Sequence, residues 1–230
     1  MFITRQFVFL HVPKTGGAFI RGVCEDHLPE GSIVELDKWE PHGSYDEIPS
    51  EFDQLPRLSF ARNPWDWYVS WYHHTLRDAA ERSGMELLFM WSALFDKGRN
   101  DFRQTLMAAS GEQEIVPPSG KGPRWLQMMR ELDVDFYTAL HLMIVGREAD
   151  AAKVEIGRFE TLRPDFLDFV ARHNVVHDGG LGEAVLTRPR VNTGDRREYQ
   201  EYYDDELRDL VARRARPLIE EFGYSFENGA

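Results

Sequence analysis

The chain has 230 residues, 42% of them hydrophobic, which is enough for one large α/β domain with a sizeable core or, as the alternative, for two small ones, and we expect one. It carries 39 acidic and 27 basic residues, and a formal net charge of -12 argues against general binding to nucleic acid or anionic membranes. Any anion site must therefore be local. The single cysteine, Cys24, cannot form an internal disulfide, and no His/Cys cluster has metal-ligand spacing, so we expect no metal.

The hydrophobic runs of the sequence are short. The first of them, residues 7–12, has polar flanks and is too short for a signal peptide or a membrane anchor. No later run approaches the roughly 18 apolar residues of a membrane-spanning helix. We therefore expect a soluble, cytoplasmic protein without membrane insertion, and a reducing compartment fits the lone cysteine.

The first predicted elements are a strand, a glycine turn and a helix. The apolar run FVFLHV, residues 7–12, predicts a strand that ends at Pro13. Gly16 and Gly17 follow it, and in residues 18 to about 26 the apolar side chains recur at helical spacing.

A polar connection leads to the second predicted strand. Residues 37–52 are rich in Pro, Gly and Ser, which predicts a loop with a short helix near its end. The run RLSFA, residues 57–61, predicts a buried strand that Asn63 and Pro64 terminate. An aromatic helix over residues 65–82 follows, because a proline suits the first helical position, where its missing N–H costs nothing.

The second half of the chain begins with an irregular insert. Residues 84–135 are predicted as patches of helix around a loop, residues 112–124, whose prolines and glycines exclude regular structure. We expect this part to serve as a lid or an acceptor-binding region. The run KVEIGRF, residues 153–159, predicts a third strand, and residues 165–174 predict the helix after it.

The C-terminal stretch, residues 201–224, predicts one long charged helix that stops at Gly223. Its apolar residues stand at helical spacing, at Leu207, Leu210, Val211 and Leu218. Strands that alternate with helices predict a parallel sheet covered on both faces. The expected fold is α/β, with a P-loop-like parallel β-sheet flanked by helices. It forms a single domain over residues 1–230 with a helical insert at about 84–150.

The stretch PKTGGAF, residues 13–19, has the features of an anion site. A glycine turn between a strand and a helix points successive backbone N–H groups and the positive end of the helix dipole at one spot. Gly16 and Gly17 let the backbone come close, while Thr15 adds a hydroxyl and Lys14 a full positive charge. On this stretch alone, the alternative is an ordinary tight turn with a surface lysine.

The order of these residues differs from that of a nucleoside-triphosphate loop. Lys14 precedes the glycines, and no upstream glycine has the spacing of G-x-x-x-x-G-K-[ST]. A P-loop-type nucleotide or small-molecule kinase, which needs Mg²⁺ and a carboxylate at a strand end, is therefore the second hypothesis. A non-catalytic anion-binding module ranks last. Such a module could lose the loop lysine Lys14 and the histidine His42, which could act in catalysis, and both are present.

Four stretches carry a resemblance to a known family. HVPKTGG, residues 11–17, resembles the 5'-phosphosulfate loop of PAPS-dependent sulfotransferases, and FARNPWDWYVSWYHH, residues 60–74, resembles their 3'-phosphate motif. Both occur in the family's order, each at the exit of a predicted strand. Residues 156–162 and 190–226 resemble the later strand and the C-terminal region of carbohydrate-type members. The middle, roughly residues 84–150, is unmatched.

The resemblance implies the sulfotransferase fold and an enzyme of the EC 2.8.2 class, similar to bacterial members. PAPS would be the donor, PAP the product, and no metal would be required. The acceptor would be a hydroxyl of a carbohydrate or another small molecule, while the oligomeric state stays open. The charge of -12 disfavours a long polyanionic acceptor unless the cleft is locally basic. Candidates for such a patch are Arg77, Arg103, Lys121 and Arg124.

The resemblance also implies roles for individual residues. Lys14 matches the lysine beside the bridging oxygen, where it would stabilise the leaving phosphate. Arg62 and Ser70 match the arginine and serine that hold the 3'-phosphate, although Ser70 read alone is an ordinary helix serine. Trp67 stands where the family often has a second arginine, so the resemblance does not extend to that contact. The expected cofactor-binding set is Lys14, Thr15, Gly16, Gly17, Ala18, Arg62, Ser70, Asn192 and Thr193.

The general base is less sharply determined. His42 lies between the two phosphate motifs, where histidine-using members carry their base, and a pKa near 6.5 suits proton abstraction near neutrality. Glu40 and Glu47 are the competitors, because other branches use a glutamate. The alternative for His42 is a loop histidine. Arg190 precedes the last helix with Asn192 and Thr193, where the family closes a loop over the cofactor; an ordinary polar loop is the alternative.

Overall fold

The structure, a computed structural model, describes residues 1–34, 43–77, 90, 92–117, 122–147, 150–189 and 197–227. The chain divides into two compact units. Unit 1 comprises residues 1–62 and 141–193 together with Ala230, and unit 2 comprises residues 63–140 and 194–229. One helix, α6 at Phe136–Val145, runs from unit 2 into unit 1.

Unit 1 is built on a five-stranded sheet with the order β3-β1-β2-β4-β5. The strands are β1 Phe2–Thr4, β2 Val8–Phe9, β3 Ile33–Val34, β4 Arg57–Ala61 and β5 Val154–Arg158. The neighbours β2, β4 and β5 are parallel, with Phe9 opposite Leu58 and Leu58 opposite Glu155. These are the three strands that the sequence predicts, so the α/β prediction is confirmed.

The rest of the sheet corrects the sequence-based picture. β1 pairs with β2 and with β3 in antiparallel fashion, so the sheet is mixed rather than wholly parallel. β2 is also shorter than the strand predicted over residues 7–12. The β1–β2 turn is held by Thr4, whose Oγ1 accepts hydrogen bonds from the backbone N–H groups of Gln6 and Phe7. Strands of two or three residues are too short for a periodic pattern to show in sequence.

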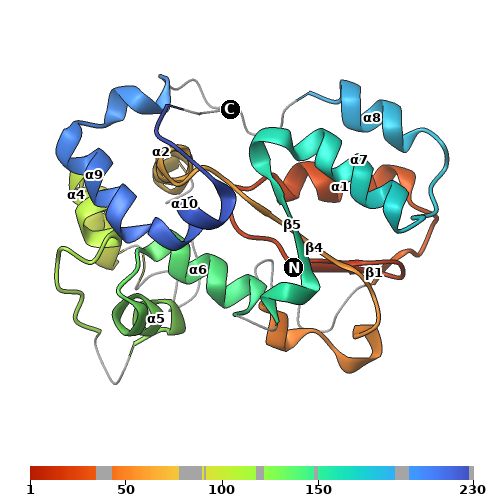
Figure 1. Cartoon of the computed structure of the whole chain (residues 1–230), viewed down its shortest axis with the longest axis horizontal. Coiled ribbons are helices and arrows are strands. Elements are labelled where there is room, and N and C mark those ends of the chain that lie inside the picture. Colours follow the sequence, from red (N-terminus) through yellow and green to blue (C-terminus); the bar gives the residue numbers. More distant parts are fainter. Residues whose placement is uncertain are drawn as a thin grey trace. The chain divides into compact units, whose positions relative to one another are not determined.

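Within the described residues, three α-helices belong wholly to unit 1 and lie beside the sheet: α1 Gly17–His27, α7 Leu162–Arg172 and α8 Leu181–Thr187. They lie together next to the strands in Figure 1, and α8 packs against both α1 and α7. The predicted α1 is confirmed. α7 starts three residues earlier than predicted, because Pro164 falls in its first turn, where backbone N–H groups have no intrahelical acceptor.

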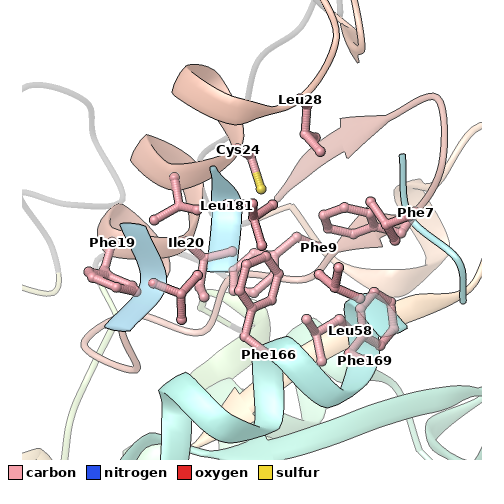
Figure 2. Close-up of a cluster of buried hydrophobic side chains, with 14 of the residues drawn as sticks. Phe7, Phe9, Phe19, Ile20, Cys24, Leu28, Leu58, Phe166, Phe169 and Leu181 are labelled. Atoms are coloured by element: carbon pink, nitrogen blue, oxygen red, sulfur yellow. The ribbon is translucent and has the colours of Figure 1, made fainter. Parts of the chain in front are cut away.

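The core of unit 1 lies between these helices and the sheet. Figure 2 shows side chains from α1, α7 and α8 meeting those of β2 and β4, with Phe166 and Phe169 among them. Phe7 meets Phe169 edge-on, with ring centroids 5.4 Å apart. The thiol of Cys24 is part of this core, and its side chain is buried.

Unit 2 contains the remaining described α-helices. They are α2 Pro64–Arg77, α4 Phe102–Ala109, α5 Arg124–Leu132, α9 Asp205–Arg214 and α10 Arg216–Phe222. Its core is aromatic: Trp67 stacks on Tyr137 with centroids 4.2 Å apart and on Trp71 at 5.4 Å. The prediction of an aromatic helix after Pro64 is confirmed over the described residues.

The single long C-terminal helix predicted over residues 201–224 is wrong. The stretch instead forms two helices, α9 and α10, that meet at Ala215. Pro217 lies in the first turn of α10, because proline has no backbone N–H and cannot continue the hydrogen bonds of α9. The predicted stop at Gly223 is confirmed, with a φ of 63° that glycine adopts readily.

Short 3₁₀ helices link these elements. They are η1 Tyr45–Glu47, η2 Ser50–Phe52, η4 Asp96–Gly98, η5 Ala151–Lys153, η6 Phe159–Thr161 and η7 Tyr199–Tyr202. η1 and η2 are the short helical part expected near the end of residues 37–52. Of the helices within the described ranges, none has the length and apolar character needed to cross a membrane.

Candidate functional site

The loop between β2 and α1 forms the centre of the candidate site. Two of its residues have left-handed backbone conformations, Lys14 with a φ of 66° and Gly16 with a φ of 90°. Alternation of left-handed and ordinary conformations turns successive N–H groups toward one side, which makes a concave site for an anion. The loop predicted from the sequence therefore has the backbone form that the prediction needs.

The two glycines of the loop are required by their neighbours. A Cβ atom on Gly16 would lie 2.2 Å from Cδ1 of Leu162, and one on Gly17 would lie 2.1 Å from Cδ2 of His11. Such distances are far below van der Waals contact. The His11 side chain is therefore packed directly against Gly17, the first residue of α1.

The start of α1 adds the electrostatic part of the site. The first bonded N–H of the helix is that of Phe19, which donates to the carbonyl of Gly16 over 3.0 Å. The N–H groups of Gly17 and Ala18 precede this bond, in the positions that a helix leaves without an intrahelical acceptor. Ala18 is exposed, and the first turn carries no acidic residue. The positive end of this helix is therefore open to an anion.

The hydroxyl of Thr15 already has a partner in the structure. Its side chain is fully buried, and Oγ1 donates to the carbonyl of Val12 over 2.8 Å. A hydroxyl has one proton to donate, so this bond holds the turn together. Contact of Thr15 with an anion would then come from its backbone N–H.

Arg62 is brought to the same loop from β4. Its residue is 5% exposed, and Nη1 donates to the carbonyl of Lys14 over 2.9 Å. The guanidinium carbon also lies 4.0 Å from the centre of the Phe159 ring. Two of the predicted site residues, 48 positions apart in sequence, are therefore in direct contact.

A cation follows or ends each of the three parallel strands. Lys14 follows β2, Arg62 follows β4, and Arg158 is the last residue of β5. Ligands of parallel sheets bind beyond the carboxyl ends of the strands, so a positive edge favours an anionic ligand there. Arg158 and Phe159 are not among the site residues predicted from the sequence, although their place at the exit of a predicted strand was a signal.

The predicted serine of the second motif belongs to unit 2. Ser70 lies on α2 and is half-buried. The start of that helix is secured by Asn63, whose Oδ1 accepts the N–H of Trp65 and whose Nδ2 donates to the carbonyl of Ser225. The role of Ser70 stays a prediction of the sequence.

Several predicted residues lie outside the described part of the chain. They are His42, Glu40, Arg190, Asn192 and Thr193. The third candidate base, Glu47, is described, and its Oε2 accepts hydrogen bonds from the N–H and the hydroxyl of Ser44, at 2.6 and 2.9 Å. Because this carboxylate caps η1, its use as a base would weaken the cap.

Three tryptophans are core residues of unit 2 and have little exposed ring surface. Trp65 and Trp125 are each 3% exposed, and Trp71 is 4% exposed. The Nε1 of Trp65 donates to the carbonyl of Arg208 over 3.0 Å. Among the residues that the structure describes, no group of His, Cys, Asp and Glu is arranged to hold a metal ion.

One candidate for a basic acceptor patch is occupied by carboxylates. Arg103 donates to Asp204 over 2.6 Å and also pairs with Glu206. Arg124 is exposed, while the side chain of Arg77 and all of Lys121 lie outside the described part.

Comparison with known proteins gives one informative likeness. No family model and no curated sequence matches the chain. Among solved structures it is similar to the crystal structure of mouse sulfotransferase SULT7A1 complexed with PAP, with 15% identity and a TM-score of 0.50. The likeness covers 96% of this chain and 90% of that chain. The chain therefore has the fold of a sulfotransferase.

Proposed function

We propose that the protein is a PAPS-dependent sulfotransferase that transfers a sulfuryl group to a hydroxyl of a carbohydrate or another small acceptor. The observation that carries this proposal is the meeting of Lys14 and Arg62 at the glycine loop and the start of α1. The mouse protein with the same fold was solved with PAP, which supports the choice of ligand.

The loop fits the 5' end of such a donor. Side chains on Gly16 and Gly17 would collide with Leu162 and His11, so the two glycines let the loop pack closely on the protein while its alternating backbone turns N–H groups to one side. The N–H groups from Thr15 to Ala18 would bind its oxygens. PAPS supplies a sulfuryl group whose bond to the 5'-phosphate oxygen breaks as the acceptor oxygen bonds to sulfur.

The protein would contribute positioning and charge stabilisation. Lys14 would neutralise the negative charge that grows on the phosphate oxygen as it leaves. His42 would take the proton of the acceptor hydroxyl, since an imidazole is suited to proton transfer near neutral pH. Arg62 and Ser70, with Asn192 and Thr193, would hold the 3'-phosphate and fix the donor in line with the acceptor.

The setting of the enzyme follows from the same reasoning. We propose a carbohydrate-type, bacterial-like member that works in the cytoplasm on a small acceptor. The net charge of -12 and the paired state of Arg103 are the supporting observations. A single sulfotransferase domain with an acceptor-binding insert at about residues 84–150 completes the proposal.

Ligand preference tests the proposed function. In calorimetry we expect tight binding of adenosine 3',5'-bisphosphate without metal, and loss of that binding in Arg62→Ala, because the variant lacks the guanidinium at the loop. Arg103→Ala is the control, since its partners are Asp204 and Glu206. A preference for ATP with Mg²⁺ would instead support the kinase.

The base can be tested separately. We expect His42→Ala to retain bisphosphate affinity while turnover on the acceptor falls by about 10²- to 10⁴-fold, the usual contribution of a general base. Glu47→Gln serves as the comparison, because its carboxylate caps η1. Near-normal turnover in His42→Ala would remove His42 from the mechanism.

A further inference from the structure

The guanidinium of Arg62 contacts the chain itself at the candidate site. Nη1 holds the carbonyl of Lys14 at 2.9 Å, and the residue is 5% exposed. The Lys14 backbone has a φ of 66°, a left-handed conformation that costs energy for any residue with a Cβ atom. The hydrogen bond from Arg62 therefore stabilises the loop in a conformation that it would otherwise tend to leave.

Phe159 sets the position of that guanidinium. The ring centre lies 4.0 Å from the guanidinium carbon, within the range of a cation–π contact. The same ring reaches the loop, since its Cδ2 would be 3.5 Å from a Cβ atom on Gly16. One aromatic ring is therefore packed against both the arginine and the loop that the arginine holds.

The ring itself is fixed by its local structure. Phe159 begins η6 directly after β5, and it packs against the core of unit 1. The N–H of Arg158 and the hydroxyl of Thr161 both donate to Oδ2 of Asp165, each over 2.8 Å. These bonds tie the residues on either side of the ring to α7. Phe159 is thus a firm support for a cation.

We propose that Phe159 and Arg62 brace the Lys14 carbonyl and so hold the glycine loop ready for the 5' end of its ligand. Phe159 is then a positioning residue that acts through Arg62. This brace, formed by Phe159, Arg62 and the Lys14 carbonyl, rests on the proposed function in one respect: the ligand of the loop must carry a 5'-phosphate. It predicts that Arg62 affects ligands that have no 3'-phosphate at all.

Adenosine 5'-monophosphate is the probe, because it lacks the 3'-phosphate. We expect Arg62→Met and Phe159→Leu each to lower its affinity at least threefold in calorimetry, and the double variant to bind no more weakly than the weaker single variant. Phe159→Tyr, which keeps the ring, should restore wild-type affinity. Phe169→Leu makes the same exchange in the same core, on a ring that meets Phe7, and should leave affinity unchanged.

Two results would overturn the brace. Wild-type affinity for the monophosphate in Arg62→Met would mean that Arg62 does not hold the loop. A full additional loss from Phe159→Leu in the Arg62→Met background would mean that the ring touches the ligand directly.

A measurement without ligand separates the brace from the proposed function. In urea unfolding of the wild type, Arg62→Met, Phe159→Leu and the double variant, we expect the two substitutions to be non-additive by about twofold to thirtyfold in the equilibrium constant, the range of a cation–π pair. Additive effects would refute the brace even in a protein that binds the bisphosphate. Non-additive effects in a protein that binds no nucleotide would refute the function and keep the brace.

Discussion

At the level of single residues, the glycine loop shows why two glycines stand side by side. Gly16 needs glycine both for its φ of 90° and because Leu162 occupies the space of a side chain, whereas Gly17 needs it only because the His11 ring occupies that space. The sequence motif does not separate backbone conformation from packing. The structure assigns both requirements to Gly16 and packing alone to Gly17.

Gly17→Ala should therefore destabilise the protein. We expect the free energy of unfolding in urea to fall by about 1–3 kcal/mol, because the new methyl group must displace the His11 ring. Gly182→Ala is the matched control: Gly182 also lies in the first turn of a helix, and a Cβ there would meet nothing within 4 Å. That control should be neutral or gain up to about 1 kcal/mol. Equal effects of both substitutions would contradict the packing argument.

At the level of elements, α6 carries two buried titratable groups. Asp135 precedes its first residue, and its Oδ1 accepts the N–H of Thr138 over 2.8 Å. Burial raises the pKa of Asp135 to about 6, although hydrogen bonds from Thr138 and Tyr68 act in the opposite direction. Burial lowers the pKa of His141, within the same helix, to about 4. The folded state therefore favours the neutral form of both groups.

The two shifts give stability opposite pH dependences. Between pH 4 and 6 the folded state retains the Asp135 proton that the unfolded state loses, so this group makes stability fall as pH rises. Over about pH 4 to 6.5, His141 binds a proton in the unfolded state but stays neutral in the folded state. This group therefore makes stability rise with pH. The two contributions largely offset each other in the wild type.

Asp135→Asn should expose this balance. Asparagine keeps the cap on α6 and removes the titration, so between pH 4 and 6 the unfolding free energy of the variant should rise with pH relative to wild type. The expected relative change is roughly 2–3 kcal/mol, at about 1.4 kcal/mol per pKa unit. Urea unfolding at several pH values measures it. A variant curve parallel to that of the wild type would show that Asp135 does not titrate in this window.

The C-terminal region shows which element features sequence patterns capture. The apolar positions Leu207, Leu210, Val211 and Leu218 are all buried, as their spacing predicts. The same periodicity continues across Ala215, where the chain changes from α9 to α10. Hydrophobic spacing predicts which face of a helix is buried. It does not reveal a break between two helices when the same face stays buried on both sides of the break. Pro217 was the local signal for the break.

At the level of the whole molecule, the sequence predicts a single domain, and the structure divides the chain into two compact units. α6 belongs to both: Phe136 and Tyr137 lie in the aromatic core of unit 2, and Ile144 and Val145 are buried residues of the part assigned to unit 1. A helix that unfolds in one half loses the backbone hydrogen bonds that join it to the other half. We therefore expect the two units to unfold together.

Two probes can test this cooperativity. Cys24 reports on unit 1, because burial raises the pKa of its thiol to about 12 and a thiol reagent should react with it only on unfolding. Tryptophan fluorescence reports on unit 2, which holds Trp65, Trp67, Trp71 and Trp125. Trp39→Phe and Trp91→Phe remove the two tryptophans outside the described residues. We expect both urea midpoints to coincide. Separate midpoints would mean independent domains.

The sequence by itself determined the local features of this protein. The three parallel strands, the helix after the glycine turn, the helix after Pro64 and the loop itself follow from short-range patterns of apolar residues, glycine and proline. These patterns reflect the backbone preferences of the residues and the burial of one face of each element. Both properties depend mainly on residues that are close together in sequence.

Only the tertiary structure decided how distant residues combine. The contact of Arg62 with Lys14, the ring of Phe159 over the guanidinium and the packing of His11 on Gly17 join residues that no local pattern links. The very short strands β1 and β3 likewise depend on their pairing partners. Such contacts form only when separate elements pack together. Their energies therefore depend on which residues become neighbours in the folded chain, and a local sequence pattern does not give those neighbours.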